Sequence, residues 1–489
     1  MSTPDVKDDL KRSADSPEGA GRAVLGTRAA AGGSRELLAL ALPLVVSQSF
    51  MTVQVFVDTT LLSWHNPLEM AASLPAVMWF WLGFGTLQVA AGYVSTFVAQ
   101  YMGAGRPHRV GPAVWQGIYF ALISGLLFLL IVPAAPYLIA MGGHSAELQR
   151  LETTYLRCLG FAGLPMLILA AINGFFSGRG QTWTVLGIEA VGTSVNIALA
   201  MLFIFGRWGA PELGIAGAGW ATVVGSWASA LTALALVLKR RYAHEFNTRG
   251  GWRFESDLFR RLIKYGLPAG AQVFSDVLVF HLFVQLLGRL GENEAGATSL
   301  TIRLNMLAFL PMQGIAQAIS ILVGQRLGGD RPDLAERSTF TGMRWAFGYM
   351  CLVAAIYVLF PHQLVALFEG DRDPVSFAKV ADLVPPLLAC AAVYSLADAV
   401  NLSIAFALRG AGDTRFVSIL TFLLAWPLMV LPTYRLVQVR GNLLYGWVFA
   451  TAYILAMALC FTWRFRTGKW KTMRVIESAP ELIGPASAI

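Results

Sequence analysis

Twelve long apolar runs fix what this 489-residue chain can fold into. Each run has about 20 or more mostly apolar residues, the length that an α-helix needs to cross a bilayer. The runs are 36–63, 68–101, 111–141, 150–177, 182–205, 213–239, 259–289, 295–327, 337–368, 378–408, 413–436 and 442–465. Charged residues make up 13% of the chain, against roughly 25% in soluble domains. We therefore expect an all-α, polytopic membrane protein with twelve transmembrane helices.

Composition also excludes several classes of protein. A chain that is 56% hydrophobic is neither a soluble enzyme nor a nucleic-acid-binding protein, and its net charge of +8 suits loops facing anionic lipid. The four cysteines lie in apolar runs without the spacing of metal ligands, so we expect packing residues and no disulfide framework.

The ends of the chain are polar, and the basic residues set its orientation. Residues 1–34 lack the apolar core of a signal peptide and are expected to form a disordered tail. With both ends on one side, that side has 27 Lys and Arg and the other has 7. Because basic loops stay in the cytoplasm, we predict cytoplasmic tails at 1–34 and 467–489.

The two groups of six runs are repeats of each other. Residues 98–107 match 323–332 at an offset of 225, and residues 178–182 match 410–414 at an offset of 232. The predicted parts are an N-terminal lobe at 35–240, a linker at 241–257 and a C-terminal lobe at 258–466. Six is an even number, so the halves enter the membrane in the same direction as a parallel repeat. Two such lobes around a central cleft, rocking to give alternating access, are a transporter architecture.

Several motifs occur in order along this duplication. They are Pro43 and Pro268 in the first helix of each half, the stretch 56–59, the Gln-x-x-Gly motifs at Gln100 and Gln325, and residues 407–414. Over nearly all of 36–466 the chain resembles the multidrug and toxic compound extrusion (MATE) family. Asp276 makes it most similar to the NorM-like bacterial branch. The resemblance implies efflux of amphipathic organic cations in exchange for Na⁺ or H⁺ across a bacterial inner membrane, by a monomer without a cofactor.

Asp58 lies near the end of the first apolar run. A carboxylate at bilayer depth is costly, so a retained one usually lines a polar interior and has a function. The alternative is that Asp58 reaches water at the helix end. Gln54 lies on the same helix face as Asp58. The resemblance implies that Asn196 of the fifth span faces Asp58.

The fifth span departs from the family pattern. Where the family usually has Asp or Asn, four residues after Asn196, this chain has Ala200. Glu189 lies two turns before Asn196 on the same face. We hypothesise that Glu189 replaces the lost group and relays protons to Asp58; the alternative is that it meets water.

The second half contains a fuller set of polar residues. Gln272 and Asp276 share one helix face, and Tyr394, Asp398 and Asn401 share another. The resemblance implies that Asp276, Tyr394 and Asp398 form a cation site that could take Na⁺. Asp276 is one methylene shorter than the Glu common in that branch. The alternative is that the two acids are polar glue between helices.

Other candidates concern the cleft. Gln54, Gln272, Phe280, Phe283, Arg303 and Met306 are expected to line a substrate cleft, where aromatic and Met side chains suit flat organic cations. Arg303 could pair with Asp276 or Asp398, or could snorkel outward. Arg409 and Arg415 are interpreted as cytoplasmic loop residues.

A flippase and an intramembrane protease are the alternatives to a cation-coupled multidrug antiporter. A flippase for a lipid-linked or polysaccharide precursor should line its cleft with several Arg or Lys, whereas the candidates here are mainly acidic. An intramembrane aspartyl protease needs Gly-x-Gly-Asp within a span, and 410–413 falls between spans. The chain has no Gly-x-x-x-x-Gly-Lys loop for ATP, so an ion gradient must supply the energy. We expect a transporter and not an enzyme.

Overall fold

The computed structural model of the chain describes residues 32–368, 374–439 and 441–477. Residues 1–31 and 478–489 of the predicted tails lie outside the described residues. Within the described part every regular element is a helix, and twelve helical stretches are long and apolar enough to cross a membrane. These observations confirm the predicted all-α, twelve-span fold.

The spans of the two halves follow one another along the chain. In the first half the helices are α3 (Ser34–His65), α4 (Pro67–Gly92), α5 (Val94–Gly103), α6 (Val110–Phe128), α7 (Ile131–Ala140), α8 (Ala146–Gly178), α9 (Thr182–Phe205) and α10 (Ile215–Val237). The short α11 (Arg240–Phe246) lies in the linker. In the second half they are α12 (Ser256–Gly288), α13 (Glu292–Gly328), α14 (Pro332–Leu359), α15 (Pro361–Ala366), α16 (Pro374–Ala411), α17 (Thr414–Ala425), α18 (Leu431–Gln438) and α19 (Leu443–Arg466).

Four predicted runs are each divided into two helices, so their prediction as single helices was wrong. The run 68–101 divides into α4 and α5, and the run 413–436 divides into α17 and α18 with a π-helical turn, Trp426–Val430, between them. The other two breaks lie at prolines. The run 111–141 divides into α6 and α7, with Pro133 in the first turn of α7. The run 337–368 divides into α14 and α15, with Pro361 at the start of α15. Proline has no N–H to donate to the preceding turn but fits the first turn of a new helix, which explains both breaks.

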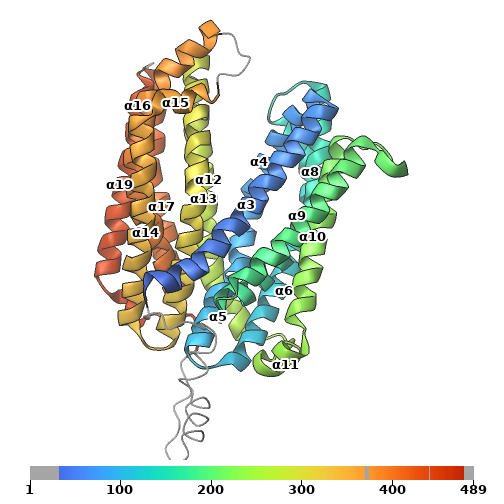
Figure 1. The fold of residues 1–489 in the computed structure, drawn as a ribbon, viewed down its shortest axis with the longest axis vertical. Coiled ribbons are helices and arrows are strands. Elements are labelled where there is room, and N and C mark those ends of the chain that lie inside the picture. The colour runs from blue at the N-terminus through green and yellow to red at the C-terminus, as the bar shows by residue number, and fades with distance from the viewer. Residues whose placement is uncertain (1–31, 369–373, 440, 478–489) are drawn as a thin grey trace, which may run out of the picture.

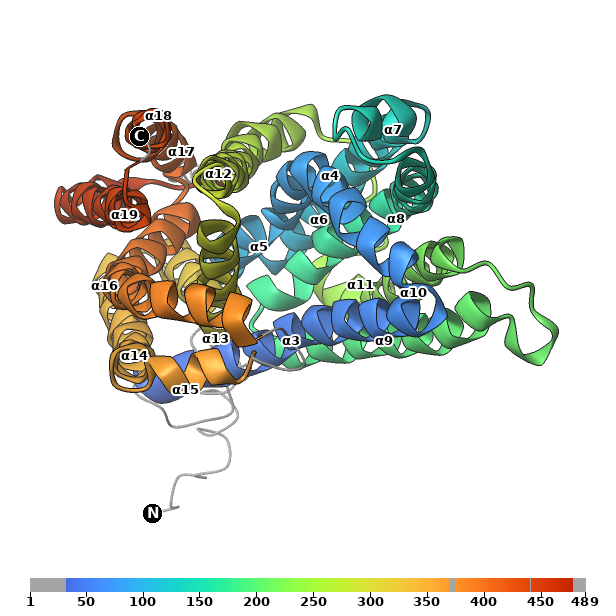
Figure 2. The same ribbon diagram turned by 90° about the horizontal axis from the view of Figure 1, so that it is seen from above.

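The first helix of each half crosses into the core of the other half. Leu37, Leu40 and Leu44 at the start of α3 are buried in the core built by the second half. Leu258 and Leu262 at the start of α12 are buried in the core of the first half. Figure 1 shows α3 running from the base of the bundle of α13 and α14 to the far end of the bundle of α4 and α8. From above, α3 lies between α13 and α9 (Figure 2).

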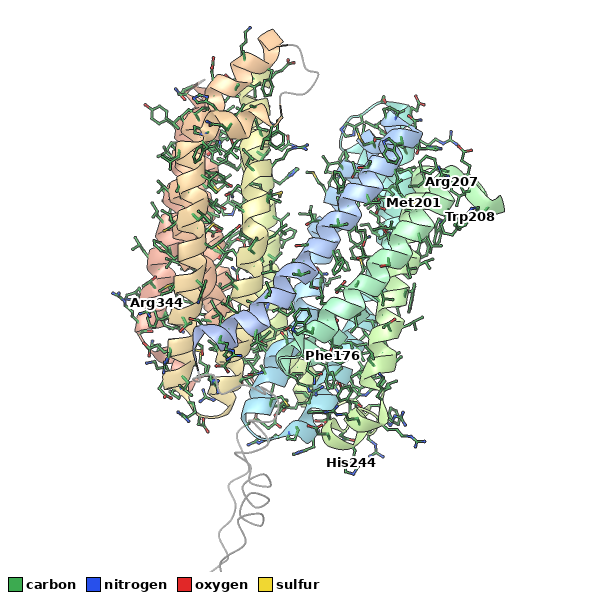
Figure 3. All side chains as sticks on the ribbon, viewed as in Figure 1. Phe176, Met201, Arg207, Trp208, His244 and Arg344 are labelled. Atoms are coloured by element: carbon green, nitrogen blue, oxygen red, sulfur yellow. The ribbon has the colours of Figure 1, made fainter. Side chains whose placement is uncertain are left out.

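The two bundles lie close together at the end that contains α5, and their ribbons diverge toward the opposite end (Figure 1). An ion pair between Arg326 of α13 and Glu36 of α3 lies at the close end. Phe176 is fully buried within the first half, whereas Arg344 of α14 points away from the bundle (Figure 3).

The four cysteines are all free in the structure. Cys158 is buried and packs against Gly219. Cys351, however, is exposed on α14. Its interpretation as a packing residue was wrong, because α14 presents this position to the outside of the bundle.

Candidate functional site

Three predicted residues of the second half come together between two helices. Asp276 is half-buried on α12, and Tyr394 and Asp398 project from α16, where Asp398 is 4% exposed. Asp276 interacts electrostatically with Asp398, and Tyr394 interacts with both carboxyl groups. Asn401 donates a hydrogen bond from Nδ2 to Asp398 Oδ1 over 3.2 Å. We call Asp276, Tyr394, Asp398 and Asn401 the C-terminal cluster.

A residue that sequence reasoning missed completes this cluster. Tyr453 of α19 is 5% exposed and interacts electrostatically with Asp276, Tyr394 and Asp398. Its hydroxyl has no hydrogen-bond partner among the described residues, and neither does Asn401 Oδ1. The only signal in the sequence was a Tyr in the middle of the last apolar run.

Arg409, and not Arg303, is the arginine that meets the cluster. Its interpretation as a loop residue was wrong, because α16 continues through Ala411 and carries Arg409 in its last turn. The Arg409 guanidinium donates from Nε and Nη2 to Gln272 Oε1, over 3.2 and 2.8 Å, and interacts electrostatically with Asp276. Gln272 is therefore held by an arginine, one helical turn from Asp276.

Arg303 lies on α13 with an exposed side chain. No ion pair within 4 Å joins it to Asp276 or Asp398 in the described part of the chain. The structure therefore does not show the pairing of Arg303 with either acid.

Asp58 is buried at 6% exposure on α3, and its Oδ1 has no hydrogen-bond partner within the described residues. It interacts electrostatically with Tyr155 of α8, which sequence reasoning also missed. The alternative that Asp58 reaches water is thus wrong for this conformation, because α3 buries this face against the other helices of the first half.

Asn196 and Glu189 have partners of their own on neighbouring helices. Asn196 is 1% exposed and donates from Nδ2 to Thr222 Oγ1 of α10 over 3.3 Å. Glu189 is half-buried and accepts a 2.8 Å hydrogen bond from Asn173 Nδ2 of α8. The structure therefore links Glu189 to α8 and shows no hydrogen bond from it to Asp58.

The predicted cleft residues differ in accessibility. Met306 is 61% exposed, and Gln54 and Phe280 are partly exposed. Phe283 is 1% exposed and packs edge-to-face on Trp447, so its side chain belongs to the core in this conformation. A pocket of about 180 Å³ lies between α4 and α12, lined in part by Trp81 and Phe274.

Comparison with known proteins shows which family has this fold and these residues. The family model described as MatE matches residues 43–202 and 268–434, one block in each half. The chain belongs to the MatE family. This is the family that the sequence motifs resemble.

Two curated relatives are similar to this chain in sequence, and one solved structure is similar in fold. The multidrug resistance protein NorM of Aliivibrio fischeri is 28% identical over 395 residues, covering 80% of this chain and 84% of the relative. The probable multidrug resistance protein NorM of Shewanella oneidensis is 28% identical over 398 residues, with the same coverage. A structure described as the outward-facing conformation of a multidrug resistance MATE family transporter has a TM-score of 0.81 at 21% identity. It covers 90% of this chain and 96% of that one.

The C-terminal cluster of this MatE protein, taken together with Tyr453, offers mainly oxygen atoms as possible cation ligands. The C-terminal cluster offers two carboxylates, two tyrosine hydroxyls and an amide oxygen, all of which are hard ligands suited to Na⁺ or to a proton. No group of three or more His, Cys, Asp or Glu that could hold a metal ion occurs in the described ranges.

Proposed function

We propose that this membrane transporter exports amphipathic organic cations in exchange for H⁺ or Na⁺. The observation that carries the proposal is the C-terminal cluster, where two acids on different helices share one buried site. Two buried carboxyl groups that interact electrostatically are costly to keep charged together without a counter-ion. A proton, Na⁺ or a cationic substrate can supply that charge, so binding of one competes with binding of the others.

The substrate class is supported by the relatives and by the aromatic and Met residues of the predicted cleft. Both curated relatives are called multidrug resistance proteins. Trp81, Phe280 and Met306 supply aromatic and thioether surface, which adapts to flat cations of varied shape. A negative site beside such surface selects positive, amphipathic molecules.

The transport cycle follows from the two halves. We propose that the lobes 35–240 and 258–466, joined by the linker 241–257, rock about the crossing helices α3 and α12 to give alternating access. The basic end is cytoplasmic, as are both termini, and the protein lies in the bacterial inner membrane as a monomer. Asp58 serves its own lobe as a second titrating site.

An efflux assay in a pump-deficient bacterium tests this function. Ethidium efflux should accelerate when an inward Na⁺ or H⁺ gradient is imposed. Asp276→Asn and Asp398→Asn should each slow it by about tenfold or more, because a hydrogen bond or ion contact to a charged group is worth about 1.5–3 kcal/mol.

Asp382→Asn is the matched control, since Asp382 is an exposed carboxylate on the same helix as Asp398. Equal amounts of each variant in the membrane must be verified. Efflux that ignores both gradients would refute antiport. Wild-type efflux rates in both Asp276→Asn and Asp398→Asn would show that the two acids only stabilise helix packing.

A further inference from the structure

The two Gln-x-x-Gly motifs of the repeat meet where the halves touch. Gln100, in the last turn of α5, donates from Nε2 to the carbonyl oxygen of Gly410 over 3.0 Å. Gln325, in the last turn of α13, donates from Nε2 to the carbonyl oxygen of Gly178 over 2.8 Å. Each glutamine thus reaches from its own half to the other. Donors and acceptors are exchanged by the internal repeat, so the contact is reciprocal.

The glycine of each motif allows this approach. A Cβ on Gly103 would overlap the carbonyl oxygen of Gln325, and a Cβ on Gly328 would overlap that of Gln100. The backbones of α5 and α13 therefore touch at the motif, with no room for a side chain between them. The same two motifs supply the hydrogen-bond donors and the space for close contact.

An arginine lies next to each acceptor glycine, and each arginine has contacts of its own. Arg179, next to Gly178, is 5% exposed and stacks on the rings of Phe175, Tyr242 and Phe246 at 4.4, 4.7 and 4.0 Å. On the other side the carbonyl of Arg409, next to Gly410, accepts a 2.7 Å hydrogen bond from the Tyr93 hydroxyl of the first half. The hydrogen bond from Tyr93 is a further contact between the halves, one residue from Gly410.

The Gln100 side chain is buried only while the two halves stay together at this end. Gln100 is 0% exposed, and its Oε1 accepts a 2.8 Å hydrogen bond from the backbone N–H of Val475. Separation of the halves at this end would break both reciprocal hydrogen bonds and admit water between α5 and α13.

We infer that Gln100 and Gln325 are positioning residues that form a reciprocal clasp, which holds the transporter closed at this end during its cycle. The inference rests on the proposed alternating access and on neither the coupling ion nor the substrate. The clasp links the cycle to the cluster, because Arg409 contacts Gln272 with its side chain and Tyr93 with its backbone. Opening toward this end requires the clasp to release.

A thiol-labelling experiment tests the clasp without any transport assay. Thr96 on α5 is 4% exposed, and its carbonyl lies against Gly324 of α13. Thr96→Cys, in a chain whose four native cysteines are replaced, should react slowly with a maleimide added to the close end. Gln100→Ala and Gln325→Ala should each raise the rate by about fivefold or more, as expected for one hydrogen bond in a two-state equilibrium. The double variant should label faster than either single variant, because each change removes a contact from the closed state.

Gln116→Ala is the matched control. Gln116 is 0% exposed and donates to the carbonyl of Arg253 over 3.1 Å, a contact between α6 and the linker and not between the halves. It should leave the labelling rate unchanged. Gln325→Glu keeps the shape of the side chain but cannot donate, so it should label like Gln325→Ala and serves if alanine lowers the amount of protein. Wild-type labelling rates in the Gln100 and Gln325 variants would overturn the inference, and so would a rate in the Gln116 control that is raised as much as in those variants.

Discussion

Individual residues show where sequence reasoning succeeds and where it fails. Helical spacing placed Tyr394 and Asp398 on one helix face, and the family resemblance implied that Asp276 joins them; in the structure Tyr394 interacts electrostatically with both acids. Tyr453 could not be proposed, because a single tyrosine in an apolar run is indistinguishable from one that faces lipid. Arg409 was misplaced because apolar runs end before helices do when a helix continues into a polar interior.

Glu189 allows a clean test of the proton-relay hypothesis. Glu189→Gln keeps an Oε1 that can accept the hydrogen bond from Asn173 while it removes the titrating carboxyl. If Glu189 relays protons to Asp58, proton-driven efflux should fall by about tenfold, with its pH dependence changed, while protein amount and thermal stability stay the same. Unchanged efflux with an unchanged pH profile would leave Glu189 as a helix-packing residue only.

At the scale of helices, hydropathy predicted the number of spans but not their internal breaks. The divisions between α6 and α7 and between α14 and α15 depend on single prolines within otherwise continuous apolar runs. The linker was predicted as a polar break, and the structure adds the short α11 within it. Such short helices are stabilised by tertiary contacts, which the periodicity of a sequence does not contain.

The segment after α19 packs across both halves at the close end. Trp470 is fully buried, and Lys471 and Arg474 form ion pairs with Glu336 and Asp330 of the second half. Glu477 accepts a 2.6 Å hydrogen bond from Tyr101 of the first half. The basic composition of this tail suggested only a cytoplasmic location, since ion pairs between distant residues leave no local pattern.

The attachment of this segment should depend on pH in one direction. Burial alone would raise the pKa of Glu477, but the Tyr101 hydrogen bond and the charges of Arg109 and Arg261 outweigh it and lower the pKa. A carboxyl group with a lowered pKa stabilises the attached state at any pH above its ordinary pKa. This contribution is lost as the pH falls through the lowered pKa. Attachment should therefore be constant from about pH 8 to pH 5 and weaken below about pH 4.

Spin-label mobility checks this expectation. A label at Thr472→Cys should stay immobile until strongly acidic pH, whereas Glu477→Gln should make it more mobile at every pH. A second label on α19, at Thr462→Cys, reports whether the bundle itself unfolds. Mobility that rises between pH 8 and pH 6 would contradict the proposed role of Glu477.

At the scale of the whole molecule, the internal repeat predicted which residues correspond between the two halves. Its offset of 225 relates Gln100 to Gln325 and Gly103 to Gly328, and these residues meet across the halves. The exchange of α3 and α12 between the cores could not be predicted, because apolar faces do not specify which bundle buries them. The lobe boundaries remain a prediction, since helices that cross between the cores make any single boundary a choice.

Ion movement driven by an organic cation in proteoliposomes most directly tests the proposed exchange of that cation for H⁺ or Na⁺. Ethidium moving down its own gradient through the purified protein should drive H⁺ or Na⁺ in the opposite direction, measured with an internal pH dye and with a radioactive Na⁺ tracer. The opposed ion flux should disappear in Asp276→Asn and persist in Asp382→Asn. Ethidium movement without an opposed flux of either ion, or an unchanged flux in Asp276→Asn, would contradict the proposed exchange.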